Sequence, residues 1–90
     1  MLDTLQKPGF KRIYKKLTPD IKSAVNEAIE VIQKNPDIGE LKKGNLAGLR
    51  VYKFKIHQQQ KLLAYTVGQN AITLLTLGTH ENFYRDLKTK

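Results

Sequence analysis

Hydrophobic positions near the start of the chain recur with the spacing of an α-helix. Between residues 8 and 17 they stand at i, i+3, i+4 and i+7, which places them on one helical face: Phe10, Ile13, Tyr14 and Leu17. Pro8 suits the first position of this helix, because the nitrogen of a first-turn residue needs no helical hydrogen bond. The pattern predicts a first amphipathic helix that begins at Pro8.

A second helix is predicted directly after the first. Thr18 is a suitable N-cap, Pro19 a suitable first helical residue, and Asp20 complements the helix dipole. The helix ends before Pro36, which disfavours helical geometry at the preceding residue. Its apolar stripe consists of Ile21, Ala24, Val25, Ala28, Ile29 and Ile32. The two helices and their tight turn form a predicted helical hairpin.

The second half of the chain changes to the patterns of β-strands. Residues 49–56, 61–67 and 71–77 are rich in β-branched, aromatic and leucine side chains. Residues 57–60 and 68–70 separate them as short polar turns. We therefore expect an antiparallel meander of three strands.

The two ends of the chain give weaker patterns. Residues 1–7 are ambiguous and are compatible with a short first strand, whereas Thr79 can cap a short C-terminal helix with Glu81 in its first turn. We expect one α+β domain spanning residues 1–90. In this domain the N-terminal helical hairpin packs on a small antiparallel β-sheet.

The strand at residues 49–56 has two chemically different faces. Tyr52, Phe54 and Ile56 fall on one parity and are expected to pack under the helices. The other parity holds three cationic or titratable side chains: Lys53, Lys55 and His57. Because lysine is a poor strand former and like charges on one face repel, this second face is a candidate phosphate-binding surface. The alternative is an ordinary solvated sheet face.

The charge balance favours a polyanionic partner. Sixteen Lys and Arg residues against eight Asp and Glu give a net charge of +8 and a pI near 9.8. Between residues 40 and 65 Glu40 is the single acidic residue, and the basic ones are Lys42, Lys43, Arg50, Lys53, Lys55 and Lys61. Lys61 can join the lysines of the preceding strand if the strand register allows. Lys42, Lys43, Arg50 and His57 are candidate RNA or phosphate contacts.

Several functional classes are excluded by the residues that are absent. The chain has no cysteine, so disulfides and thiolate metal sites cannot form. It contains no apolar run long enough to cross a membrane, and we expect a cytoplasmic protein. His57 and His80 are far apart and lack a carboxylate cluster, so we expect no metal and no cofactor. No nucleotide-binding loop or serine triad is visible.

Catalysis without a metal would depend on lysine, arginine, histidine and tyrosine. His80 and Tyr84 are four residues apart and share a face of the expected C-terminal helix. Such a pair offers a proton donor or acceptor beside an aromatic ring that can stack on a base. This set suits attack of an RNA 2′-OH on its own phosphodiester, which needs a base, an acid and cations for the phosphorane charge.

The order of these segments resembles the RelE/ParE superfamily of bacterial type II toxins. The resemblance covers about residues 8 to 88 and is carried by "GLRVYKFK", "LLAY" and "LGTHENFY". It implies a RelE-like fold and a metal-free mRNA interferase that cuts mRNA in the ribosomal A site. It also implies a cognate antitoxin, with an acidic or amphipathic segment that covers the groove between helices and sheet.

The resemblance also implies roles for individual residues. His80 would be the main general acid or base, and Tyr84 would stack on a base or help to position the 2′-OH. Lys53, Lys55 and Lys61 would hold the phosphate. Lys61 stands where relatives carry an arginine, and a lysine cannot form the two parallel hydrogen bonds that a guanidinium donates to phosphate. Two alternatives remain open: a ParE-like inhibitor of DNA gyrase, and a non-catalytic module that binds RNA or the ribosome.

Overall fold

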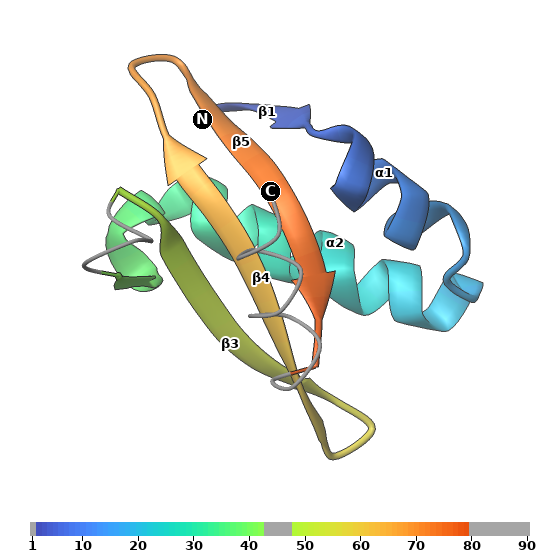
Figure 1. Cartoon of the computed structure of the whole chain (residues 1–90). Helices are drawn as coiled ribbons and strands as arrows, with labels where there is room; N and C mark the ends of the chain where they lie inside the picture. Colours follow the sequence, from blue (N-terminus) through green and yellow to red (C-terminus); the bar gives the residue numbers. More distant parts are fainter. Residues whose placement is uncertain (1, 43–47, 80–90) are drawn as a thin grey trace.

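Two helices lie across one face of a five-stranded sheet in the computed structural model, which describes residues 2–42 and 48–79 (Figure 1). The helices are α1 (Pro8–Lys15) and α2 (Pro19–Lys34), and both begin at the proline that the sequence marks. Thr18 occupies the N-cap of α2, but its hydroxyl donates to Asp20 rather than capping a backbone N–H. The predicted helical hairpin and its place on the sheet are therefore confirmed.

The sheet has the strand order β1-β5-β4-β3-β2. The predicted antiparallel meander corresponds to β3 (Arg50–Ile56), β4 (Gln59–Val67) and β5 (Ala71–Gly78). Two flanking strands extend it, namely β1 (Asp3–Gln6), which pairs parallel to β5, and β2 (Glu40–Leu41), which pairs antiparallel to β3. The sheet is thus mixed and larger than the antiparallel one expected. The sequence pattern did not predict this, because β1 pairs with a strand at the far end of the chain and local patterns do not reveal such pairings.

The turn between β3 and β4 is shorter than the four residues predicted. His57 and Gln58 have φ values of 51° and 68°, and Gln59 already pairs with Ile56. Two consecutive residues with positive φ are typical of the two-residue hairpin turn whose twist matches that of the strands. Asparagine and glycine usually mark such turns. Their absence here explains why the sequence pattern suggested a longer connection.

The main core lies between the helices and the sheet. Phe10 of α1 and Val25 and Ile32 of α2 are fully buried against sheet residues that include Leu63 and Leu74. Tyr52, Phe54 and Ile56 belong to this core, as predicted from their parity. A 3₁₀ turn, η1 (Pro36–Ile38), follows α2 and returns the chain to the edge of the sheet.

A second, smaller apolar cluster occupies the opposite face of the sheet. It contains Leu49, Val51, Leu62 and Ala64, with Leu75 packed beside them. Since Leu62 to Tyr65 are all fully buried, β4 is covered on both faces. A strand buried on both faces is typically a continuous apolar run, which accounts for the sequence LLAY.

The hydroxyl of Tyr65 joins β4 to the segment that leads from α2 into β2. It donates to the carbonyl oxygen of Pro36 at 2.7 Å and accepts from the backbone N–H of Gly39 at 2.8 Å. A Cβ on Gly39 would lie 2.6 Å from this oxygen, so only glycine fits. Burial raises the pKa of Tyr65, so the hydroxyl keeps the proton that it donates.

Replacement of Tyr65 by Phe should lower the free energy of unfolding by about 1–3 kcal/mol, because it leaves the Gly39 N–H and the Pro36 carbonyl without their partner. Chemical denaturation of both proteins measures this difference. Tyr52→Phe is the matched control, since the hydroxyl of Tyr52 makes no hydrogen bond within the described residues. Equal losses in the two variants would contradict a structural role for the Tyr65 hydroxyl.

Candidate functional site

Lysine side chains gather on the sheet face that points away from the helices. Lys53 and Lys55 share the parity of Val51, which belongs to the apolar cluster on this face. Both side chains are exposed, and neither forms an ion pair within residues 2–42 and 48–79. Two residues along a strand span roughly 7 Å, so the two ammonium groups can contact one short stretch of a polyanion.

Lys42, which directly follows the short strand β2, lies on the same face. Glu40 pairs with Val51, and the backbone N–H of Lys42 donates to Leu49, so both residues lie beside the lysines of β3. The Lys42 ammonium donates to Glu40 at 3.1 Å, and this hydrogen bond, with the charges of Lys42 and Lys53, lowers the pKa of that carboxyl. We call Lys42, Lys53 and Lys55 the lysine face.

Two other predicted phosphate ligands lie on the opposite side of the sheet. Lys61 pairs with Phe54, whose side chain packs toward the helices, so the register does not allow Lys61 to join the lysine face. Arg50 has the same opposite parity. Its guanidinium donates to the carbonyls of Asp37 and Gly39 and pairs with the Asp37 carboxylate at 3.3 Å. It thereby holds the segment between α2 and β2.

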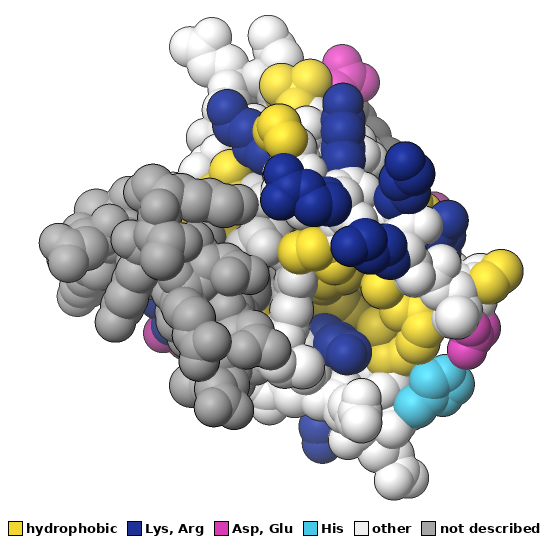
Figure 2. Space-filling model, turned by 45° about the vertical axis from the view of Figure 1, so that its right-hand side comes forward, with side chains coloured by type: hydrophobic (Ala, Val, Ile, Leu, Met, Phe, Trp, Pro, Cys, Tyr) yellow, Lys and Arg dark blue, Asp and Glu magenta, His cyan; other side chains and the backbone are white. Residues whose placement is uncertain are grey.

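His57 does not continue the lysine face, and the prediction of its placement is wrong. The strand ends at Ile56, and the positive φ of His57 turns the chain away. Its Nε2 lies 3.1 Å from Oδ2 of Asp20 at the start of α2, so this pair ties the hairpin to the helix. In Figure 2 the single cyan side chain lies beside an acidic one at the rim of a hydrophobic hollow. The two residues are 37 positions apart, and no local pattern predicts that they pair.

Three predicted site residues, His80, Tyr84 and Lys43, lie outside the described residues, as does the expected C-terminal helix. Within the described ranges, no three His, Cys, Asp or Glu side chains are close enough to hold a metal ion. No described helix is both long enough and apolar enough to cross a membrane.

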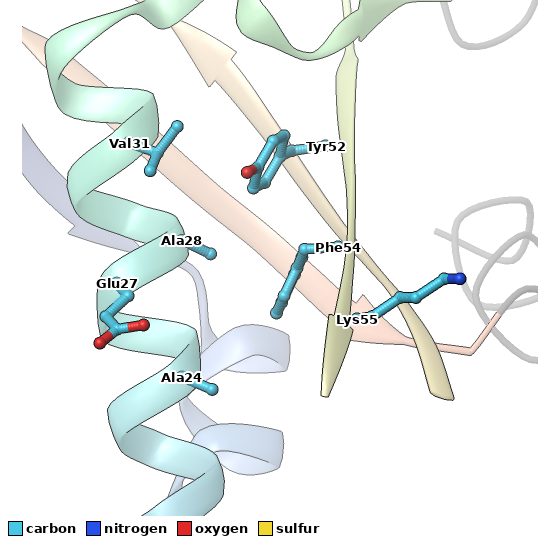
Figure 3. Close-up of a pocket in the computed structure, with 7 residues that line it drawn as sticks. All are labelled: Ala24, Glu27, Ala28, Val31, Tyr52, Phe54 and Lys55. Atoms are coloured by element: carbon cyan, nitrogen blue, oxygen red, sulfur yellow. The ribbon is translucent and has the colours of Figure 1, made fainter. Parts of the chain in front are cut away.

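A groove of about 200 Å³ separates α2 from β3. Figure 3 shows Tyr52 and Phe54 pointing from β3 toward Ala24, Ala28 and Val31 of α2, while Lys55 points to the other side of the strand. Small alanines four residues apart leave room beside the two stacked rings, whose centroids are 5.7 Å apart. Glu27 adds a negative charge to the lining, whereas the ammonium of Lys55 lies on the other side of β3. The groove is thus an apolar slot at the open edge of β3.

Comparison with known families decides the class of this protein. The sequence profile of a family described as "ParE-like toxin of type II bacterial toxin-antitoxin system" matches residues 4–88. The chain belongs to the RelE/ParE superfamily of toxins. Comparison by sequence with curated proteins finds no match.

Solved structures share the fold of this toxin. The toxin-antitoxin complex RelBE2 from Mycobacterium tuberculosis contains a chain with a TM-score of 0.74 and 20% identity, covering 88% of this toxin and 98% of that chain. A chain of the RelBE complex of Escherichia coli has a TM-score of 0.71 and 16% identity. The match covers 90% of this toxin and 99% of that chain. A conserved hypothetical protein from Helicobacter pylori is 27% identical, with a TM-score of 0.55. The match covers 89% of this toxin and 96% of that chain.

The side-chain hydrogen bonds of Asp20 with Thr18 and His57 make the toxin's stability depend on pH in the acidic range. A hydrogen bond from Thr18, and then the one with His57, lower the pKa of Asp20 from 3.8 to about 2. Because the pKa is lower in the folded state, the ionised carboxylate stabilises the fold above pH 4. That contribution is lost as the pH falls from about 4 to 2.

Asp20→Asn should therefore reduce the loss of stability between pH 4 and pH 2. Urea midpoints of wild type and variant, measured from pH 6 to pH 2, test this expectation. Glu30→Gln is the matched control, since the Glu30 side chain is exposed and makes no hydrogen bond or ion pair in the described part of the chain. Parallel curves for wild type and Asp20→Asn would show that the carboxylate has the same pKa in both states.

Proposed function

We propose that this toxin is a metal-free, ribosome-dependent endoribonuclease that cuts mRNA in the ribosomal A site and arrests translation in the cytoplasm. The observation that carries the proposal is the lysine face. Lys53 and Lys55 are exposed and lie two residues apart on one strand, and Lys42, whose ammonium is bonded to Glu40, lies beside them. Cations in this arrangement are better suited to bind an RNA phosphodiester than to bind an apolar surface of another protein.

The reaction proposed is internal transesterification. The 2′-OH of a nucleotide gives its proton to a base and attacks the adjacent phosphorus, and the bond to the 5′-oxygen of the next nucleotide breaks. The 5′-oxygen takes a proton from an acid, so the products carry a 2′,3′-cyclic phosphate and a 5′-hydroxyl. Lys53 and Lys55 stabilise the charge on the pentacovalent phosphate. By resemblance to relatives, His80 exchanges the protons and Tyr84 stacks on a base.

Lys61, Arg50 and His57 take no part in this phosphate site. The register turns Lys61 to the other side of the sheet, Arg50 is engaged by the carbonyls of Asp37 and Gly39, and His57 is paired with Asp20. The proposal therefore retains the lysine face as its phosphate-binding part.

The double variant Lys53→Ala/Lys55→Ala should cut mRNA on programmed ribosomes about a hundredfold more slowly or worse, because the transition-state charge loses both cations. Primer extension on a reporter mRNA, with pulse-labelled protein synthesis, measures the cleavage. Lys34→Ala removes an exposed lysine from the end of α2 and is the control. His80→Ala should abolish cleavage while ribosome binding persists.

Inhibition of DNA gyrase is the second candidate, and the ParE-like description of the matching family favours it. It predicts arrested replication with intact mRNA and unchanged early protein synthesis. That result in the wild type would overturn the nuclease proposal. Unchanged cleavage in the lysine double variant would refute the role of the lysine face.

A cognate antitoxin, encoded nearby, is the proposed partner of the groove between α2 and β3. Its apolar side chains would enter the slot against Tyr52 and Phe54, and its acidic side chains would approach Lys55. Val31 at this slot is 37% exposed, so a change there affects binding more than folding.

Val31→Glu should weaken antitoxin binding at least tenfold, because a carboxylate would be buried without a partner. Calorimetric titration of toxin with antitoxin measures the affinity. Ser23→Glu places the same charge on an exposed position of α2 outside the groove and should bind like the wild type. Equal affinities of the two variants would place the antitoxin elsewhere.

A further inference from the structure

The strand β1 leaves one edge of the sheet open. It stands first in the strand order, and within the described residues no strand pairs with it on the side away from β5 (Figure 1). The N–H groups of Asp3 and Lys7 donate to carbonyl oxygens of β5 and of the residue before it. Because backbone groups alternate in direction along a strand, those of Thr4 and Gln6 point to the open edge. Such an edge is a template for a further strand.

The side chains of β1 are arranged symmetrically about Leu5. Its two neighbours, Thr4 and Gln6, are polar, and the opposite charges of Asp3 and Lys7 follow at equal distances on either side. Leu5 is 57% exposed, more than any other large hydrophobic side chain in the described structure. The strand therefore carries an exposed apolar centre between two opposite charges.

Asp3, Leu5 and Lys7 lie on the sheet face that points away from the helices. Leu2 has the opposite parity and packs against the core under the helices. The backbone of Lys7 is still extended, with a ψ value of 156°, so its side chain continues the alternation. Within residues 2–42 and 48–79, neither Asp3 nor Lys7 forms an ion pair or a side-chain hydrogen bond. The folded chain thus leaves three exposed side chains in a row without partners.

A second copy of β1 fits the open edge in one antiparallel register. With Leu5 opposite Leu5 of the other copy, Thr4 lies opposite Gln6, and each such pair exchanges two backbone hydrogen bonds. The same register places Asp3 opposite Lys7 twice, and directly opposed charges of opposite sign attract. A shift by two residues would place Leu5 opposite Asp3 or Lys7 and would lose both charge pairs.

We propose that two copies of this toxin pair through β1 and form a symmetric dimer with one continuous sheet. Each strand offers the same residues to the other, so the contact closes at two copies and does not extend into a fibre. The two-fold axis is perpendicular to the sheet, which places both helical layers on one side and both lysine faces on the other. This interaction is independent of the proposed nuclease activity.

The opposite edge of the sheet is less suited to a second copy, because Lys53 and Lys55 on β3 would oppose the same charges. The contact at β1 is small, so the dimer is weak and depends on concentration. The net charge of +8 on each copy opposes association. Salt at about 0.15 M screens the distant charges most, and the directly opposed pairs least.

Charge reversal at β1 tests the pairing by analytical ultracentrifugation, from about 10 μM to about 1 mM protein. Asp3→Lys and Lys7→Asp each replace both charge pairs by like charges, and each should weaken self-association at least tenfold. An equimolar mixture of the two variants should associate like the wild type, because two lysines of one copy then face two aspartates of the other. Restored association also shows that both variants fold.

A matched control separates local pairing from general repulsion. Lys7→Asp lowers the net charge of +8 by two, so general repulsion alone would predict stronger association, whereas the proposed pairing predicts weaker association. Lys15→Asp makes the same change at an exposed position at the end of α1 and should associate at least as well as the wild type.

Amide hydrogen exchange locates the contact. The N–H groups of Thr4 and Gln6 should become protected as the protein concentration rises, whereas those along the open edge of β3 should not. A protein that stays monomeric at all concentrations would overturn the proposal, and so would a dimer that both single variants retain. Loss of antitoxin binding in these variants, with self-association unchanged, would assign the edge to the antitoxin instead. None of these measurements uses mRNA cleavage, so failure of the proposed nuclease leaves their outcome unaffected.

Discussion

The register between β3 and β4 is the constraint on which the rest of the molecule depends. It pairs Lys53 with Leu62 and Phe54 with Lys61, and it thereby decides which side chains enter the core. Because side chains alternate with a period of two, a slip by one residue would bury Lys53 and Lys55 under the helices and expose Tyr52 and Phe54. The groove and the lysine face would be lost together. Both candidate surfaces are therefore consequences of one strand alignment.

Three contacts hold this register, and they are spread along the two strands. At one end the positive φ values of His57 and Gln58 fix a two-residue turn, which the contact between His57 and Asp20 ties to α2. At the other end Tyr65 bonds the segment that follows α2. Between them Leu62 and Leu63 are fully buried on opposite faces, so a slip would place their neighbour Lys61 in a core position.

Local patterns predicted the elements of this fold well, because its helices and central strands are short-range features. The apolar periodicity and the two prolines located α1 and α2, and the parity of β3 separated Tyr52 and Phe54 from the lysines. The parallel pairing of β1 with β5 joins distant parts of the chain and has no local signature. The position of Lys61 depended on the length of one turn, and the turn lacks the usual asparagine and glycine.

The site was predicted less completely than the fold, for a related reason. Lys53 and Lys55 could be assigned to one face by parity alone, but the partners of His57 and Arg50 come from segments distant in sequence.

The lysines of β3 also have a physical role that does not depend on the proposed binding of RNA. β2 pairs only with Arg50 and Val51, so from Tyr52 to Ile56 the outer edge of β3 has no neighbouring strand in the described structure. An open edge beside an apolar groove invites pairing with a second copy of the chain, and lysines on an edge strand oppose this by repulsion. The same edge remains open to an acidic partner, which would neutralise Lys55 while it fills the groove. Positive charge at this edge therefore disfavours pairing with another copy of the chain and favours a partner that carries negative charge.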